Sequence, residues 1–111
     1  MIVIIDYGMG NLGSVLKSFK KVSDNVIISS SKEEIERAKK LVLPGVGHFS
    51  NGMKNLKDLD LLDLLHEKVM INRVPILGIC LGMQLFSKFS HEGEVSGLGW
   101  FDAEVVRFNV N

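Results

Sequence analysis

Short apolar runs alternate with amphipathic stretches along most of the chain. Ile2 to Ile5 is a continuous β-branched run that ends at a polar turn, as expected of a strand buried on both faces. Asn25 to Ser29, Leu41 to Leu43 and Pro75 to Ile79 repeat this pattern. Parallel strands need crossover connections, so four such runs separated by helical segments predict a doubly wound parallel sheet. The expected fold class is α/β, Rossmann-like or flavodoxin-like.

Apolar residues at helical spacing predict that helices connect these strands. Leu12 to Val22 has an apolar face with lysines on the other side. Ser31 precedes Glu34 by three residues, which indicates a capping box that opens a helix reaching Lys40.

The second half of the chain continues the helical pattern and then changes character. Phe49 to Val69 predicts a helix with a break near Asp58 to Asp60, and Leu81 to Phe89 predicts a helix directly after the fourth strand. From Glu94 onward, including Ala103 to Phe108, the sequence predicts a hairpin or an added strand.

Composition and charge exclude several classes of protein. The 111 residues are 46% hydrophobic, which suits one compact domain with a sizeable core. Thirteen basic residues balance thirteen acidic ones, so no electrostatic surface for nucleic acid or an anionic membrane is expected. The amino terminus lacks the features of a secretory signal, and a single cysteine calls for no oxidising compartment, so we expect a cytoplasmic protein.

The strongest chemical signal is the segment from Gly78 to Gly82, which has Cys80 at the junction of a predicted strand and helix. A nucleophile in such an elbow is held in a strained turn, and glycines on either side let the strand and helix backbones approach closely. The alternative interpretations are a small buried cysteine, a phosphate-binding turn and a redox thiol. The segment lacks the Lys and Ser/Thr of a P-loop, and no second cysteine is present to resolve a disulfide.

A second glycine turn complements the cysteine. A thiol that attacks an amide creates an oxyanion, which needs preorganised N–H donors. The backbone of Leu81 supplies one donor by the geometry of nucleophile elbows. The turn Pro44-Gly45-Val46-Gly47 ends another predicted strand and could supply the second donor, although on its own it reads as an ordinary Pro-Gly turn.

Four motifs carry a resemblance to a known family, and they run nearly from end to end of the chain. They are Asp6-Tyr7-Gly8-Met9-Gly10-Asn11-Leu12, Leu43-Pro44-Gly45-Val46-Gly47-His48-Phe49, Gly78-Ile79-Cys80-Leu81-Gly82-Met83-Gln84-Leu85, and Gly97-Leu98-Gly99 before Glu104-Val105-Val106-Arg107-Phe108. On these motifs the chain resembles the class I, or triad, glutamine amidotransferases. Within that family it is most similar to the amino-terminal half of the glutaminase subunit of imidazole glycerol phosphate synthase.

The resemblance implies a role for several residues, and it implies no cofactor and no metal. Cys80 would attack the amide carbon of glutamine, ammonia would leave, and water would hydrolyse the thioester to glutamate. The backbones of Leu81 and of Val46 or Gly47 would form the oxyanion hole. The substrate's polar groups would be held by Gln84 and Glu92. Asn11, which also suits a helix N-cap, would face the cyclase or synthase subunit that receives the ammonia.

One part of the family pattern is missing from the 111 residues. The resemblance implies a chain about twice as long, with a late His-Pro-Glu segment that completes the triad, and no such segment occurs. The histidines present are His48, His66 and His91, and we expect none of them to act as the base. The chain is therefore expected to be a partial domain, incomplete at its carboxyl-terminal side, with very low activity alone.

Several functional alternatives stay open at this level. The partner could be the cyclase of histidine biosynthesis, in a heterodimer with lyase activity, or a sugar-modifying enzyme of surface polysaccharide synthesis. The chain could also be a binding module that keeps the partner face without chemistry. An incomplete sheet leaves an exposed edge and apolar surface, so we expect self-association or a requirement for a complementing chain.

Overall fold

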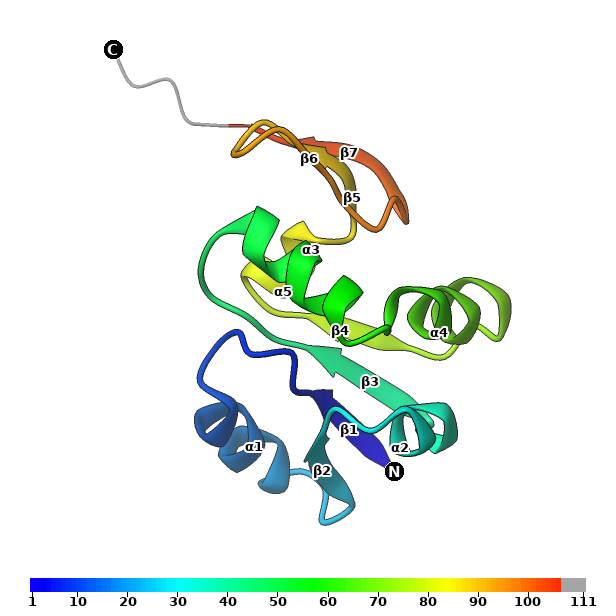
Figure 1. The fold of residues 1–111 in the computed structure, drawn as a ribbon. Helices are drawn as coiled ribbons and strands as arrows, with labels where there is room; N and C mark the ends of the chain where they lie inside the picture. Colours follow the sequence, from blue (N-terminus) through cyan, green and yellow to red (C-terminus); the bar gives the residue numbers. More distant parts are fainter. Residues whose placement is uncertain (107–111) are drawn as a thin grey trace.

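A computed structural model describes residues 1–106 of the chain. Its main layer is a four-stranded parallel sheet in the order β2-β1-β3-β4 (Figure 1). The strands are β1 (Ile2–Ile5), β2 (Val26–Ser29), β3 (Lys40–Leu43) and β4 (Ile76–Gly78). All four lie where the sequence predicts strands, and the predicted α/β fold with a parallel sheet is confirmed.

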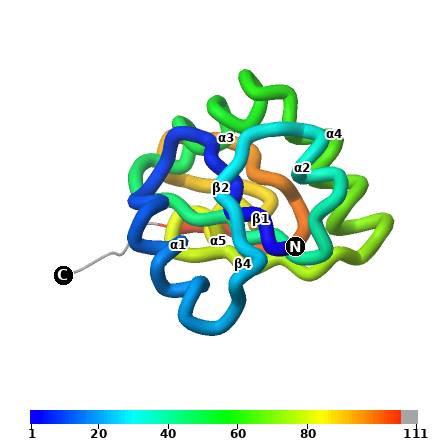
Figure 2. The backbone as a smooth tube through the Cα atoms, turned by 90° about the horizontal axis from the view of Figure 1, so that it is seen from below, coloured from blue at the N-terminus to red at the C-terminus, as the bar shows by residue number. Residues whose placement is uncertain are grey.

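Helices connect successive strands and cover both faces of the sheet. They are α1 (Leu12–Lys20), α2 (Lys32–Arg37), α3 (Phe49–Asp58), α4 (Leu62–His66), the π-helical turn η1 (Glu67–Ile71) and α5 (Leu81–Gln84). Seen from below, α1 and α4 lie on opposite sides of β1 (Figure 2). This is the layered arrangement that alternating strands and helices predict.

The core is divided between the two faces by the alternation of side chains along the strands. Val3 and Ile5 of β1 point into the larger cluster, which also holds residues of α2, α3, α4 and α5. Ile4 points to the other face, where it packs with residues of α1. Successive strand residues face opposite sides, so a strand that is apolar at every position is buried on both.

The second helix is shorter than predicted, and the expectation that it reaches Lys40 is wrong. The hydroxyl of Ser31 accepts from the N–H of Glu34 at 3.4 Å, so the predicted start is confirmed. The backbone becomes extended at Ala38, and the N–H of Lys39 donates to the carbonyl of Met1 at 3.0 Å. Pairing with β1 therefore ends the helix and starts β3 at Lys40.

The other predicted boundaries agree more closely with the structure. Leu12 to Val22 is helical as far as Lys20, and the side chain of Asn11 caps that helix by accepting from the N–H of Ser14 at 3.3 Å. The expected break after Asp58 is present, since α3 ends there and α4 begins at Leu62.

The predicted helix from Leu81 to Phe89 is wrong beyond its first turn. The helix ends at Gln84, and Ser87–Ser90 is strand β5. The carbonyl oxygens of Leu85 and Phe86 accept from the backbone of residues 98, 100 and 101 at 2.8 to 3.0 Å, so the helix does not continue through them. Tertiary hydrogen bonds outweigh the local helical spacing here.

The last described part of the chain forms a small second sheet in the order β6-β5-β7. Strand β6 (Val95–Ser96) pairs antiparallel with β5, and β7 (Phe101–Val105) pairs parallel with it. The predicted hairpin or added strand is therefore confirmed over these residues. Arg107 and Phe108, which belong to the same prediction, lie outside the described residues.

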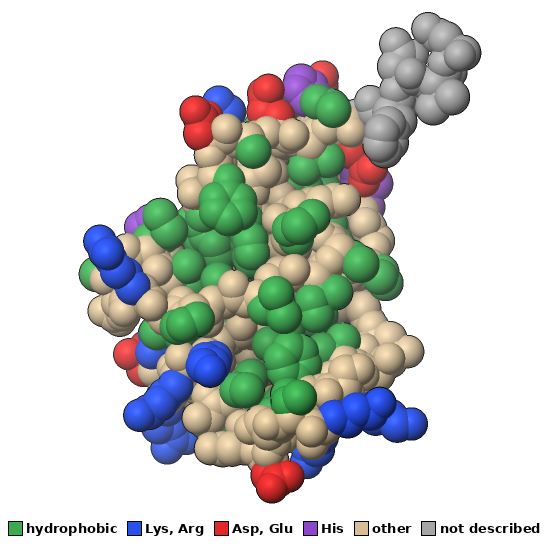
Figure 3. All heavy atoms as spheres, turned by 180° about the vertical axis from the view of Figure 1, so that it is seen from behind, with side chains coloured by type: hydrophobic (Ala, Val, Ile, Leu, Met, Phe, Trp, Pro, Cys, Tyr) green, Lys and Arg blue, Asp and Glu red, His purple; other side chains and the backbone are tan. Residues whose placement is uncertain are grey.

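One face of the molecule carries a gathering of hydrophobic side chains (Figure 3). Strand β4 is at the edge of the four-stranded sheet, and its Leu77 is 51% exposed beside an apolar groove shared with Phe19 and Ile76. The expected self-association of such an edge stays a prediction. Among residues 1–106, no helix has the length and apolar character needed to cross a membrane.

Candidate active site

Cys80 lies between the end of β4 and the start of α5 with its side chain exposed. Its φ of 53° and ψ of −116° fall outside the allowed regions for a residue with a Cβ. Such a conformation costs about 1–3 kcal/mol and persists only where the surroundings impose it. The turn therefore has the strained geometry of a nucleophile elbow.

The glycines on either side of Cys80 are required by close packing. A Cβ added at Gly82 would overlap the carbonyl oxygen of Leu43 in β3, and one added at Gly78 would lie 2.6 Å from the Cα of Met83. The strand and helix backbones thus approach as closely as the sequence pattern predicts. This packing holds Cys80 out of the sheet, at its carboxyl end.

The Pro44–Gly47 turn lies directly beside the cysteine turn. The N–H of Leu81 donates to the carbonyl oxygen of Gly45 at 3.0 Å, so this N–H is engaged within the protein. Val46 is 63% exposed, and Gly47 has a φ of 123° that a side chain would disfavour. The structure therefore brings Leu81, Val46 and Gly47 to one end of the sheet. The Leu81 N–H is already occupied there by the carbonyl of Gly45.

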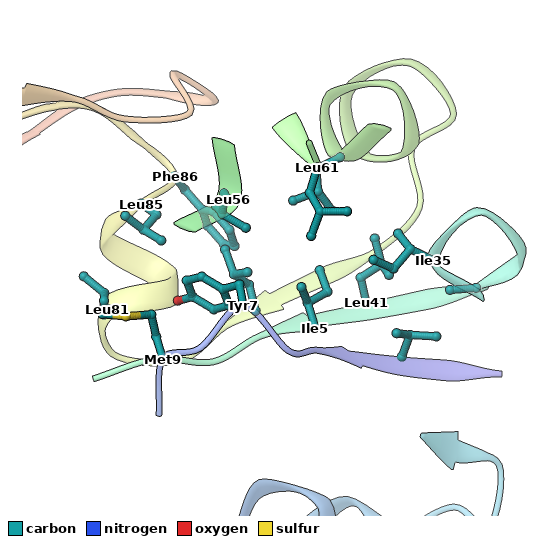
Figure 4. Packing of buried hydrophobic residues seen from close by; sticks show 14 of the residues in the cluster. Ile5, Tyr7, Met9, Ile35, Leu41, Leu56, Leu61, Leu81, Leu85 and Phe86 are labelled. Atoms are coloured by element: carbon teal, nitrogen blue, oxygen red, sulfur yellow. The ribbon is translucent and has the colours of Figure 1, made fainter. Parts of the chain in front are cut away.

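Tyr7 lies behind the Pro44–Gly47 turn. Its side chain is buried, and its hydroxyl donates to the carbonyl oxygen of Pro44. Burial raises the pKa of the Tyr7 phenol well above its usual range, so the group stays a donor. Figure 4 shows the ring beneath α5 with its oxygen on the side of Leu81. A Cβ at Gly45 would overlap this hydroxyl, which explains glycine at that position.

The turn that carries Asn11 touches the same region from the opposite side. A Cβ at Gly10 would lie 3.1 Å from the Cα of Gly45, and one at Gly47 would lie 2.9 Å from the Cε of Met9. Asn11 itself is exposed and serves as the N-cap of α1. The predicted partner face and the Pro44–Gly47 turn are therefore in contact.

The two predicted substrate-binding residues differ in their surroundings. Gln84 is exposed on α5, one helical turn after Cys80. Glu92 follows β5, and its Oε1 lies 3.6 Å from Nε2 of His48, which directly follows the Pro44–Gly47 turn. The small sheet thus brings Glu92 to this turn, whereas Gln84 is positioned by the elbow itself.

The remaining histidines are His91, which follows β5, and His66 in α4. His91 stacks edge-on against Phe89 and lies 3.7 Å from a carboxylate oxygen of Glu104. His66 is exposed on α4. Within the described part of the chain, no cluster of three His, Cys, Asp or Glu side chains could hold a metal ion.

A hollow of about 330 Å³ lies at the carboxyl ends of β1 and β2. Asp6, Ser30 and Asn55 are among its lining residues, and Cys80 is not. The geometry of the elbow is the better guide to chemistry, because the elbow presents an exposed thiol in a strained turn.

Sequence reasoning missed the parts of this site that depend on backbone orientation and distant contacts. Tyr7 belongs to the first motif of the resemblance, but its hydrogen bond to the carbonyl of Pro44 was not predicted. The carbonyl of Gly45 at the Leu81 N–H depends on a peptide orientation that glycine leaves free. The contact between His48 and Glu92 joins two turns that lie far apart in the sequence.

Comparison with known proteins places this geometry in a family. The family model for glutamine amidotransferase class-I matches residues 3–105. A solved structure described as a glutamine amidotransferase superposes on 96% of this chain with a TM-score of 0.81 at 21% identity, which supports the fold. The chain covers 57% of that structure.

Curated relatives give the same family. The chain is 50% identical over its full length to imidazole glycerol phosphate synthase subunit HisH 2 of Methanococcus maripaludis, and covers 55% of that protein. It is 52% identical over 97% of its length to HisH 2 of Pseudomonas aeruginosa, and covers 54% of it. The chain thus spans about half the length of these relatives. From the match over nearly all of its residues, we conclude that the chain belongs to the class I glutamine amidotransferases.

Proposed function

We propose that this chain is the nucleophile half of a glutaminase that hydrolyses glutamine to glutamate and delivers ammonia to a synthase subunit. The single observation that carries the proposal is the backbone of Cys80, with its positive φ between two glycines packed against neighbouring backbone. A cysteine with only a structural role is usually buried and unstrained, whereas Cys80 is exposed and has a strained backbone.

The proposed chemistry begins with attack by the Cys80 sulfur on the amide carbon of glutamine. The tetrahedral oxyanion needs two N–H donors, from Leu81 and from Val46 or Gly47. Since the Gly45 carbonyl now accepts from Leu81 at 3.0 Å, it must move away before that N–H can serve an oxyanion. The proposal therefore includes a rearrangement of the Gly45–Val46 peptide.

The missing base belongs to the same proposal. The described residues include two His-carboxylate contacts, His48 with Glu92 and His91 with Glu104, and we assign neither as the triad base of Cys80. General-base help is worth roughly 10²- to 10⁴-fold. The rest of the domain would supply the triad His and Glu. The chain alone is therefore a partial domain of low activity.

The proposed partner is the cyclase of imidazole glycerol phosphate synthase, in histidine biosynthesis. The names of the relatives from Methanococcus maripaludis and Pseudomonas aeruginosa support this choice. The exposed turn around Asn11 would form the partner face. This turn contacts Gly45 through Gly10. A partner bound to the turn could therefore shift the Gly45–Val46 peptide directly.

A completed chimera tests the proposal. It joins these 111 residues to the part of the Methanococcus maripaludis relative that lies beyond the match. We expect the chimera to release glutamate from glutamine at least about 100-fold faster than the chain alone. The Cys80→Ala chimera should be inactive. Equal rates for chimera and chain, or activity that survives Cys80→Ala, would refute the proposal.

A further inference from the structure

We infer that His48 is a positioning residue that holds the carboxylate of Glu92 ready for the α-ammonium group of glutamine. The inference rests on the proposed glutaminase function and deepens it, because it names the group of the substrate that each residue serves. It concerns a contact between two turns on the same side of the molecule as the cysteine elbow.

The first observation is the approach of the two side chains. Nε2 of His48 lies 3.6 Å from Oε1 of Glu92, and both side chains are a little over two-fifths exposed. The distance is longer than a hydrogen bond and within the range of an ion pair. Polar contacts at unoccupied sites are often long and shorten when substrate binds. The contact engages Oε1 of Glu92, so Oε2 is the oxygen that we assign to the ligand cation.

The second observation concerns the other ring nitrogen of His48. Nδ1 of His48 lies 2.7 Å from the hydroxyl of Ser50 and accepts from the Ser50 N–H at 3.3 Å. With Nδ1 as acceptor, the neutral ring carries its proton on Nε2, which faces Glu92. A neutral N–H can hold one carboxylate oxygen without cancelling the negative charge that would attract an ammonium group.

The third observation is the backbone beside the ring. A Cβ added at Gly93 would lie 2.9 Å from Cε1 of His48, so the loop after β5 rests against the imidazole. The N–H of Glu92 donates to the hydroxyl of Ser90 at 3.1 Å, which fixes the start of this loop. His48 therefore contacts both the side chain of Glu92 and the backbone of the next residue.

The chemistry of glutamine explains why such positioning matters. Its α-ammonium group needs an anionic partner, and a carboxylate held in place loses less conformational freedom on binding than a free one. Because His48 directly follows the Pro44–Gly47 turn, the same ring positions the Glu92 carboxylate relative to a proposed oxyanion donor. This links recognition of the amino group to the placement of the amide.

His48 also caps α3, so the test must separate capping from positioning. His48→Asn does this, because asparagine is among the best N-caps but is too short to reach Glu92. Binding of L-glutamine and of glutaramate, which lacks the α-amino group, is measured by NMR titration of the 111-residue chain and its His48→Asn and Glu92→Gln variants.

We expect both variants to raise the Kd for L-glutamine about tenfold and to leave the Kd for glutaramate unchanged. Thermal unfolding of His48→Asn should match the wild type. The inference is overturned if His48→Asn binds L-glutamine as the wild type does, or if it weakens both ligands equally. A wild-type chain that shows no saturable binding of L-glutamine would overturn the proposed substrate together with this inference.

Discussion

The two turns that meet at the carboxyl end of the sheet differ in how far their geometry is fixed. In the turn around Cys80, the backbone of Gly82 packs against the backbone of Leu43 and leaves no room for a Cβ. In the turn from Pro44 to Gly47, the glycines have positive φ and the peptide carbonyl of Gly45 lies at the Leu81 N–H. Packing thus fixes the position of Cys80, the proposed nucleophile, whereas the proposed oxyanion donors depend on a peptide that can turn.

The largest test of this comparison is Gly82→Ala. The new Cβ would overlap a main-chain carbonyl that cannot rotate away, so we expect a loss of at least about 3 kcal/mol in the free energy of unfolding. Gly13→Ala in α1 is the matched control, since its Cβ would find its nearest neighbour at 3.9 Å. The control should be neutral or stabilising by up to about 1 kcal/mol. Equal urea midpoints for the two variants would refute tight packing at the elbow.

A smaller effect is expected from Gly45→Ala, which probes the second turn. The new Cβ would overlap the Tyr7 hydroxyl, and residue 45 has a φ of 154°. We expect a loss of about 2–3 kcal/mol in the free energy of unfolding. In a Tyr7→Phe background, the nearest ring atom would be 3.3 Å away, so the same substitution should cost at least about 1 kcal/mol less. A double-mutant cycle of urea unfolding measures the difference. Strict additivity would show that Tyr7 does not define this turn.

The strained backbone of Cys80 predicts an unusual gain in stability when this residue is replaced by glycine. Cys80→Gly removes the penalty of a positive φ and should raise the free energy of unfolding by about 1 kcal/mol, after the entropy cost of glycine. Cys80→Ala keeps the Cβ and should stay close to the wild type. The two variants are compared by urea denaturation, and identical stabilities would argue against a strained elbow.

The smallest effect is expected far from both turns, at the exposed pair of Lys88 and Asp102. The hydrogen bond from Lys88 holds the pKa of Asp102 below its usual value, and the same bond raises the pKa of Lys88. A carboxyl whose pKa is lowered by folding stabilises the protein above its unfolded pKa, and this contribution is lost as the pH falls through the folded pKa.

Lys88→Ala should therefore lower the urea midpoint only slightly at neutral pH, because an exposed ion pair is strongly screened. The difference from the wild type should vanish in acid and shrink in high salt. A large loss that persists in acid would mean that the small sheet depends on Lys88 for packing.

The sequence predicted the parallel sheet because its strands are apolar at every position, as in Ile2 to Ile5. It also predicted the cysteine turn, because the need for close backbone approach shows directly in Gly78 and Gly82. It failed at Ser87–Ser90. Leu85, Phe86 and Phe89 have helical spacing, but the carbonyls of Leu85 and Phe86 accept hydrogen bonds from residues 98, 100 and 101. Local patterns cannot reveal such distant partners, and the same limit hid the contact of His48 with Glu92.

The central proposal is that this chain supplies the nucleophile Cys80, that the triad His and Glu come from the rest of the domain, and that the Gly45 carbonyl occupies the Leu81 N–H until it moves. The most direct measurement is the rate at which a γ-electrophilic glutamine analogue labels Cys80, followed by mass spectrometry in the chain and in the completed chimera. We predict labelling at least about 100-fold faster in the chimera, with protection by glutamine, and equal labelling of both by a small general thiol reagent. Equal rates with the glutamine analogue would contradict the claim.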